Sequence, residues 1–421
     1  MTSTLSVLAA LAIILIDLLG RAGLDKVLAL TGGPAMVGLW AQLQSVVELV
    51  SAVALAGVLQ GLTVLISQAN NSQVERNLLR DALKLGMATS LAVAVFAPLL
   101  GIMLTGGQID GDLFWFAALA GCITVIPATL NAYWLGKHRQ QRMLALSLLT
   151  SSVLLLLACG AWMGFSLRGL MTAQCIALLL IGAAIWRYMN KLHGLKLAAK
   201  RDTGDIYSGY FDKLVKFVPV GLIIGIMSPA SVLLVRGMLS DTLSWDEVGF
   251  IQALWRSSEW VTATAAGVLS LVFLPRLGVA YGSAQFTGEM ARAATAVLFP
   301  AACLLLLIYL NQRDMLAALY DARFRVSDET AALFMLGSWV RIVSWVFLFG
   351  LFAAHRTRLI IAGEALSLPL FALLLWLFAD GITLERTALL YLVSYLVYLG
   401  FTAGSLLYSV RARPPADCAG D

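Results

Sequence analysis

Long apolar runs, separated by short polar connections, recur along the whole chain. About twenty apolar residues cross a bilayer as a helix, and these runs have that length. The pattern predicts about twelve transmembrane helices, the second of which is long enough to include a break. The expected spans are 5–30, 36–69, 82–104, 112–135, 143–164, 168–188, 214–239, 247–274, 291–310, 331–353, 359–379 and 386–410.

Composition agrees with this pattern. The chain has 421 residues, of which 60% are hydrophobic and 13% charged, whereas a soluble domain is roughly a quarter charged. The mean hydropathy is +0.87. The sequence therefore predicts an all-α polytopic membrane protein and excludes a soluble domain.

The first span is expected to be retained. It begins without a preceding basic region and carries Asp17, Arg21, Asp25 and Lys26, unlike the short uniform core of a signal peptide. The cysteines contain no close pair, and all but Cys418 lie in apolar spans. They are Cys122, Cys159, Cys175, Cys303 and Cys418. Neither a disulfide framework nor a thiolate metal site is predicted.

Basic residues predict the orientation. If the N-terminus is cytoplasmic, nineteen Lys and Arg residues fall in the cytoplasmic connections and C-terminal tail, and five fall in the opposite connections. The positive-inside tendency then places both termini in the cytoplasm. The basic residues are scattered over many short loops, so the net charge of +5 does not indicate binding of nucleic acid.

The chain is predicted to consist of two similar halves. VGLWAQLQSVVELVSA (37–52) matches VGFIQALWRSSEWVTA (248–263) at Val, Gly, Glu and Val positions, with Glu48 opposite Glu259. Internal repeats are common in transporters, and six spans per half would give parallel repeats around a central cavity. The expected division is 1–189, a basic cytoplasmic linker at 190–213, and 214–421.

Charged residues inside the spans are the main functional signal. They are Asp17, Arg21, Asp25, Lys26, Glu48, Arg236, Arg256, Glu259, Arg341 and Glu364. A charge at the centre of a spanning helix costs about 2.5–3.5 kcal/mol on insertion scales. Arg256 and Glu259 are three residues apart, so they can pair on one helix face. We therefore expect these residues to face a polar interior.

Two interpretations of these charges remain open. They can be ion pairs that hold the helices together, or they can line a binding cavity. A cationic, partly desolvated cavity suits phosphate or pyrophosphate, because Arg offers a fork of donors to such oxygens. Trp255 beside Arg256, and Trp339 beside Arg341, can stack on sugars or simply pack. The predicted binding residues are Arg21, Lys26, Arg236, Arg256, Arg341, Trp255 and Trp339.

Enzymatic chemistry is not indicated. The histidines His138, His193 and His355 fall in different predicted loops, and no GxxxxGK[ST] phosphate loop is present, so no catalytic residue, metal site, cofactor or ATP motor is predicted. A transporter would then use an ion gradient or the gradient of its substrate. The candidates for coupling to H⁺ or Na⁺ are the carboxylates Asp17, Glu48, Glu259 and Glu364.

Several segments resemble the Wzx-type lipid-linked oligosaccharide flippases, including the flippases of O-antigen and enterobacterial common antigen (lipid III). SWDEVGFIQALWRSSEWVTATAAGVLSLVFLPRL (244–277) carries the most specific piece, SWDEVG. GGPAMVGLWAQLQSVVELVSAVALAGVLQGLT (32–63) and the stretch 322–365 are also similar. By position, Arg341 and Glu364 match a basic residue and a glutamate of the family. Gln44 and Asp17 stand where lipid III flippases carry an arginine and a lysine.

The resemblance implies a MOP-superfamily (MATE-like) exporter of the bacterial inner membrane. Its substrate would be an undecaprenyl-pyrophosphate-linked oligosaccharide, moved from the cytoplasmic to the periplasmic leaflet by alternating access. The implied partners are this glycan, membrane lipid, and candidate polysaccharide polymerase and chain-length proteins. Alternatives remain a multidrug or cation antiporter of the same superfamily, a membrane-embedded glycosyltransferase or ligase, and a structural membrane protein.

Overall fold

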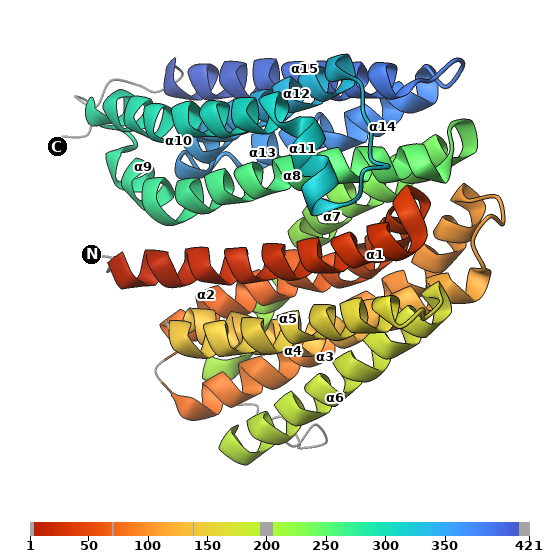
Figure 1. Ribbon diagram of the computed structural model, residues 1–421. Coiled ribbons are helices and arrows are strands. Elements are labelled where there is room, and N and C mark those ends of the chain that lie inside the picture. The colour runs from red at the N-terminus through yellow and green to blue at the C-terminus, as the bar shows by residue number, and fades with distance from the viewer. Residues whose placement is uncertain (1–3, 70, 138, 194–204, 412–421) are drawn as a thin grey trace. The chain divides into compact units, whose positions relative to one another are not determined.

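The computed structural model describes residues 4–69, 71–137, 139–193 and 205–411, and every regular element in these ranges is a helix (Figure 1). Ten of the described helical segments are long and apolar enough to cross a membrane. The prediction of an all-α multi-pass membrane protein is confirmed. The helices are α1 (Thr4–Val53), α2 (Gln60–Gln68), α3 (Ser72–Leu104), α4 (Gly111–Gly136), α5 (Gln140–Trp162), α6 (Leu167–His193), α7 (Asp205–Thr242), α8 (Trp245–Val268), α9 (Leu274–Ala280), α10 (Gln285–Leu310), α11 (Gln312–Leu319), α12 (Asp328–Ala353), α13 (Thr357–Ala365), α14 (Leu368–Leu377) and α15 (Leu384–Arg411), with π-helical segments η1 (Ala54–Leu59) and η2 (Leu269–Phe273).

All twelve predicted spans fall on helices. The first lies in α1, and the second begins in α1 and continues through η1 and α2. Helix α1 changes direction at Gly33 (φ 74°, ψ −169°) before Pro34. A positive φ favours glycine, and proline has no N–H to donate, so the sequence GGP at 32–34 encodes this break. The seventh predicted span lies in α7, where several side chains are outside the described residues.

Two predicted spans differ in detail from the observed helices. The eighth span was expected to end before Pro275, but α9 continues past it, with the proline in its first turn. The preceding η2 already departs from the regular i→i−4 pattern, and such segments accommodate a residue that cannot donate. The eleventh predicted span is two helices, α13 and α14, with Pro369 in the first turn of α14.

The start of α8 explains the SWDEVG motif. The Ser244 hydroxyl accepts from the backbone N–H of Glu247, and the Glu247 carboxylate accepts from the backbone N–H of Ser244 at 3.0 Å. This reciprocal capping box satisfies donors that a helix otherwise leaves open. Ser244 and Glu247 therefore fix where α8 begins.

The chain forms two compact units, Leu15–Asp241 and Thr242–Asp421 with Met1–Ile14. In the first, α4 contacts α2, α3, α5 and α6; in the second, α12 contacts α8, α9, α10, α13 and α15. These central helices correspond to the fourth predicted span of each predicted half.

Helix α7 groups with the first unit, so the compact units divide at a different place from the predicted halves. Gln42 Nε2 donates to the Leu233 carbonyl at 3.3 Å, and a Cβ on Gly237 would meet Leu104. The division at 1–189 and 214–421 was inferred from repeated sequence and stays a prediction. Residues 194–204 of the predicted linker lie outside the described residues.

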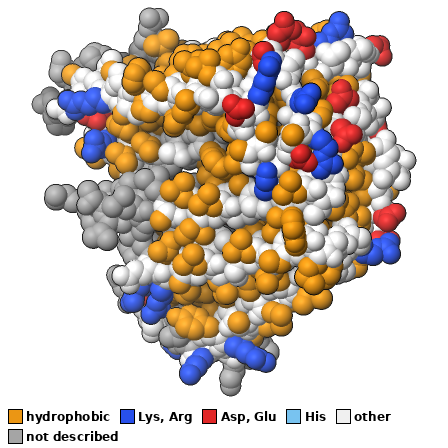
Figure 2. All heavy atoms as spheres, viewed as in Figure 1, with side chains coloured by type: hydrophobic (Ala, Val, Ile, Leu, Met, Phe, Trp, Pro, Cys, Tyr) orange, Lys and Arg blue, Asp and Glu red, His pale blue; other side chains and the backbone are white. Residues whose placement is uncertain are grey.

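The outer surface is strongly apolar. Figure 2 shows hydrophobic side chains covering much of the visible face, and many large ones are exposed, among them Phe96, Leu156, Phe299 and Leu310. Exposed apolar patches of this extent are typical of membrane-facing surfaces.

We expect Gly121→Ala to destabilise the first unit. A Cβ at this position of α4 would lie 2.9 Å from the Val47 carbonyl oxygen and 2.8 Å from Val50 Cβ, and overpacking a tight contact costs about 1–3 kcal/mol. Thermal unfolding of the detergent-solubilised protein should begin at a lower temperature. Gly23→Ala is the control, because nothing lies within 4 Å of its added Cβ. Equal stability of both variants would refute close packing of α4 on α1.

Candidate functional site

Arg341 lies at the centre of an aromatic cluster within the second unit. Its guanidinium carbon is 4.7 Å from the ring centre of Trp345, one turn along α12, and 5.6 Å from that of Tyr395 on α15. A cation above an aromatic face gains about 2 kcal/mol when desolvated. The rings thus offset part of the cost of placing this charge in a spanning helix.

Tyr391, Tyr395 and Tyr398 form a stripe along α15. Their spacing of four and then three residues places them on one helix face, and consecutive ring centres are 4.9 and 6.1 Å apart. All three are buried. We call Arg341, Trp345, these tyrosines and Glu364 the Arg341 cluster.

Glu364 of α13 closes one end of the Arg341 cluster. The Tyr398 hydroxyl donates to Glu364 Oε1 at 3.0 Å. Arg341 is near enough to Glu364 and to Glu259 for electrostatic attraction, yet among the described residues no carboxylate oxygen lies within 4 Å of its guanidinium. Its Nε is buried and has no hydrogen-bond partner. Arg341 is therefore held by rings and retains an unfilled donor.

The opposite end of the stripe is an apolar core. Phe334 of α12 stacks on Tyr391 with ring centres 4.5 Å apart and planes within 4°. Trp255 of α8 contacts Phe334, Phe371 and Tyr391 through its ring, with ring centres 5.7–6.5 Å apart. This packing positions α8, α12 and α15 around the cluster.

Arg256 and Glu259 pair as their spacing predicts. Arg256 Nη1 lies 2.6 Å from Glu259 Oε2, and the arginine side chain is only 14% exposed while the carboxylate is 37% exposed. Glu259 thus lies between two arginines, bonded to Arg256 and attracted to Arg341. Two tryptophan donors in the second unit, Trp260 Nε1 and Trp339 Nε1, are buried without hydrogen-bond partners.

A separate charge group occupies the first unit. Arg21 Nε lies 2.9 Å from Asp17 Oδ2, and Arg21 Nη1 lies 3.3 Å from Glu48 Oε1. The charge pair within the first predicted span therefore extends to Glu48 in the second. All three side chains are partly exposed.

Arg236 joins α7 to α1. Its Nη1 donates to the Ala41 carbonyl at 2.8 Å and to the Ser45 hydroxyl. Next to Ser45 in the sequence, Gln44 Nε2 donates to Gln174 Oε1 at 2.9 Å. Gln44, which stands where lipid III flippases carry an arginine, is therefore part of a neutral pair of amides. Lys26 is partly exposed.

The structure brings together one part of the predicted site. Within the second unit, Arg256, Glu259, Arg341 and Glu364 belong to one electrostatic group, flanked by Trp255. Within the first, Asp17, Arg21 and Glu48 form another. That both groups, with Lys26, Arg236 and Trp339, line one chamber stays a prediction.

Sequence reasoning missed the tyrosine stripe. YLVSYLVY at 391–398 presents Tyr at i, i+4 and i+7, which is helical periodicity of a polar aromatic residue inside an apolar run. Only the fold shows that this face meets Arg341.

Removing one partner of the Arg256–Glu259 pair should cost more than removing both. Glu259→Gln leaves a mostly buried guanidinium without its 2.6 Å partner. Because Glu259 is itself 37% exposed, we expect a loss smaller than the roughly 3–5 kcal/mol of fully buried pairs. The double variant Arg256→Met with Glu259→Gln should recover part of this loss. Thermal unfolding of the single and double variants measures the difference, and additive losses would show that the pair is not coupled.

Comparison with known proteins supports the sequence resemblance. No model of a protein family matches the chain. Proteins named lipid III flippase from Escherichia coli (strain K12) and Shigella flexneri are each 25% identical to it over 403 residues, covering 91% of this chain and 92% of the relative.

Solved structures share the fold. An inward-facing multidrug resistance MATE family transporter of the MOP superfamily superposes with a TM-score of 0.69 at 11% identity, over 96% of both chains. The MATE multidrug transporter DinF-BH gives 0.63 at 13% identity, over 97% of this chain and 96% of that one. A MOP superfamily transporter from Pyrococcus furiosus gives 0.63 at 11% identity, over 96% and 95%. The chain therefore has the fold of the MOP transporter superfamily and, as its motifs predicted, is similar to lipid III flippases along nearly its whole length.

Proposed function

We propose that this protein is a flippase for an oligosaccharide linked to undecaprenyl pyrophosphate. It carries an O-antigen or enterobacterial-common-antigen type repeat unit from the cytoplasmic to the periplasmic leaflet of a bacterial inner membrane. Similarity to proteins named lipid III flippase supports the substrate class. The observation that carries the proposal is Arg341, held between aromatic rings with an unfilled Nε donor.

Arg341 suits the diphosphate of such a substrate. A guanidinium can donate in parallel to two phosphate oxygens, and these charged hydrogen bonds are about twice as strong as neutral ones. The rings of Trp345 and Tyr395 fix the guanidinium in place, so little side-chain freedom is lost when the anion binds. The diphosphate supplies the close negative partner that the cluster lacks.

Glu259 and Glu364 make this binding reversible. Both carboxylates attract Arg341 from outside ion-pair distance, so the guanidinium is not left uncompensated when the substrate departs. A site that binds too tightly would not release its headgroup. The protein exposes the cluster first to the cytoplasm and then to the periplasm, while the polyprenyl chain stays in lipid.

The remaining basic residues have a secondary place in the proposal. Arg21 already has Asp17 and Glu48 as partners in the first unit. Arg236 already donates to Ala41 and Ser45. They and Lys26 are proposed as further headgroup contacts. Coupling to H⁺ or Na⁺ is proposed for the carboxylates Asp17, Glu48, Glu259 and Glu364.

Arg341→Ala should reduce transport of a polyprenyl-pyrophosphate-linked glycan in proteoliposomes by at least about tenfold, because each hydrogen bond to a charged group contributes about 1.5–3 kcal/mol. Arg341→Lys should retain part of the activity, since it keeps the charge and loses the fork. Arg358→Ala is the control, an exposed arginine of α13 in the same unit. Initial rates at equal amounts of reconstituted protein measure the effect.

Undiminished glycan transport by Arg341→Ala would contradict the role of this cluster. Proton- or sodium-driven export of a cationic dye by the native protein, without glycan transport, would instead establish a multidrug antiporter. The two substrates therefore separate the proposed function from its main alternative.

A further inference from the structure

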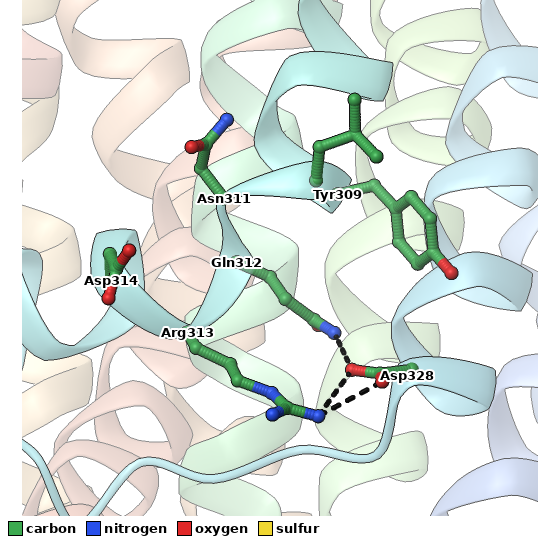
Figure 3. A pocket seen from close by; sticks show the side chains of 7 residues that line it. Tyr309, Asn311, Gln312, Arg313, Asp314 and Asp328 are labelled. Atoms are coloured by element: carbon green, nitrogen blue, oxygen red, sulfur yellow. Dashed lines mark hydrogen bonds and ion pairs between the residues drawn. The ribbon is translucent and has the colours of Figure 1, made fainter.

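A polar recess lies beside α11, in the connection between α10 and α12. Its volume is about 370 Å³, within the roughly 300–1,000 Å³ of ligand pockets. It is lined by Tyr309, Leu310, Asn311, Gln312, Arg313, Asp314 and Asp328. Figure 3 shows Gln312 and Arg313 both directed toward Asp328, at the start of α12.

Gln312 leaves an unfilled acceptor in this recess. The residue is only 4% exposed, and its Nε2 donates to Asp328 Oδ1 at 2.7 Å. An ionised carboxylate accepts and cannot donate, so this bond fixes which way the amide points. Gln312 Oε1 is consequently buried and has no hydrogen-bond partner. A buried polar group without a partner destabilises the protein until a donor reaches it.

Arg313 lines the same recess and shares Asp328 with Gln312. Arg313 Nη2 bonds both oxygens of Asp328, at 3.1 and 3.0 Å, and the arginine side chain is 78% exposed. Its guanidinium has further N–H groups beyond those that Asp328 engages. An adjoining recess of about 500 Å³ shares Gln312, Arg313 and Asp314 and extends to Phe324 and Arg325.

The balance of these groups fits a neutral polyol. A sugar hydroxyl donates and accepts at once, so it can give a hydrogen to Gln312 Oε1 and accept one from Arg313. The carboxylates of Asp314 and Asp328 would repel a phosphate, and the guanidinium of Arg313 would repel a metal cation. The ring of Tyr309 adds an apolar wall for the face of a sugar ring.

Connectivity places the recess on one side of the membrane. From Asp328 the chain crosses in α12, returns in α13 and α14, and crosses again in α15. The recess is therefore on the side opposite the C-terminal end of α15. With the C-terminus cytoplasmic, as the basic residues predict, the recess faces the periplasm, where a flipped glycan emerges.

We infer that this recess is a saccharide-binding subsite that receives sugar residues of the translocated glycan on the periplasmic side. The identification of the ligand as the translocated glycan rests on the proposed function. The subsite holds the glycan by hydrogen bonds after the diphosphate has left Arg341, and so favours release outward.

The subsite can be tested on the full-length protein in nanodiscs, with N-acetylglucosamine, glucose, galactose and mannose as separate probes in saturation-transfer NMR. Gln312→Leu removes the buried amide without changing its bulk greatly, and Arg313→Ala removes the exposed donors. Each should weaken saccharide binding about tenfold, the loss expected for about 1.4 kcal/mol. Arg323→Ala is the matched control, because this exposed arginine of the same connection pairs instead with Asp321, at 2.6 Å, and lowers the pKa of that carboxyl.

Saturation transfer that falls in Gln312→Leu and Arg313→Ala, but persists in Arg323→Ala, supports the subsite. No transfer to any of the four sugars, or equal transfer in all variants, overturns it. Thermal unfolding of each variant shows that the fold is retained. Saccharide binding at the recess without glycan transport by the native protein would overturn the proposed function and leave the subsite standing.

Discussion

Desolvation of charge inside the membrane governs this structure. A guanidinium in a spanning helix is stable only where other groups replace its water, and the described arginines show three ways of doing so: carboxylates for Arg21 and Arg256, backbone and hydroxyl oxygens for Arg236, and aromatic rings for Arg341. Oxygen partners occupy some of the N–H donors of an arginine, whereas a ring face balances its charge without occupying them. Arg341 is for this reason the intramembrane arginine best suited to an anionic ligand.

Glu48 and Glu259, which the predicted sequence repeat places opposite one another, have different partners. Glu48 reaches back to Arg21 on the preceding span, while Glu259 bonds Arg256 on its own helix. In the second unit this leaves Arg341 without a close carboxylate and places it against the tyrosine stripe of α15. The charge group of the first unit is thus compensated by carboxylates at short range, whereas Arg341 in the second unit lies against rings. The tight packing of α12 on α15, with Gly337 against Tyr391, fixes that geometry.

Much of the fold followed from hydropathy alone, because about twenty apolar residues must form a helix to cross a bilayer. The local pairing of Arg256 with Glu259 also followed, since residues three apart share a helix face. The break between α13 and α14 and the continuation of α9 past Pro275 did not, because the effect of a proline depends on the hydrogen bonds around it. The contact of Tyr395 with Arg341 joins α15 to α12 and depends on tertiary packing. So does the meeting of Gln312 with Asp328.

The proposed function depends on Arg341 holding the diphosphate while Trp345 and Tyr395 keep its guanidinium in place. A cryo-electron microscopy structure of the protein bound to a polyprenyl-pyrophosphate-linked glycan tests it most directly. We expect a diphosphate oxygen within hydrogen-bond distance of the Arg341 guanidinium, about 2.7–2.9 Å. The rings of Trp345 and Tyr395 should still lie against the guanidinium. A diphosphate bound to other residues, with Arg341 still enclosed by the same rings and contacting no ligand atom, would contradict it.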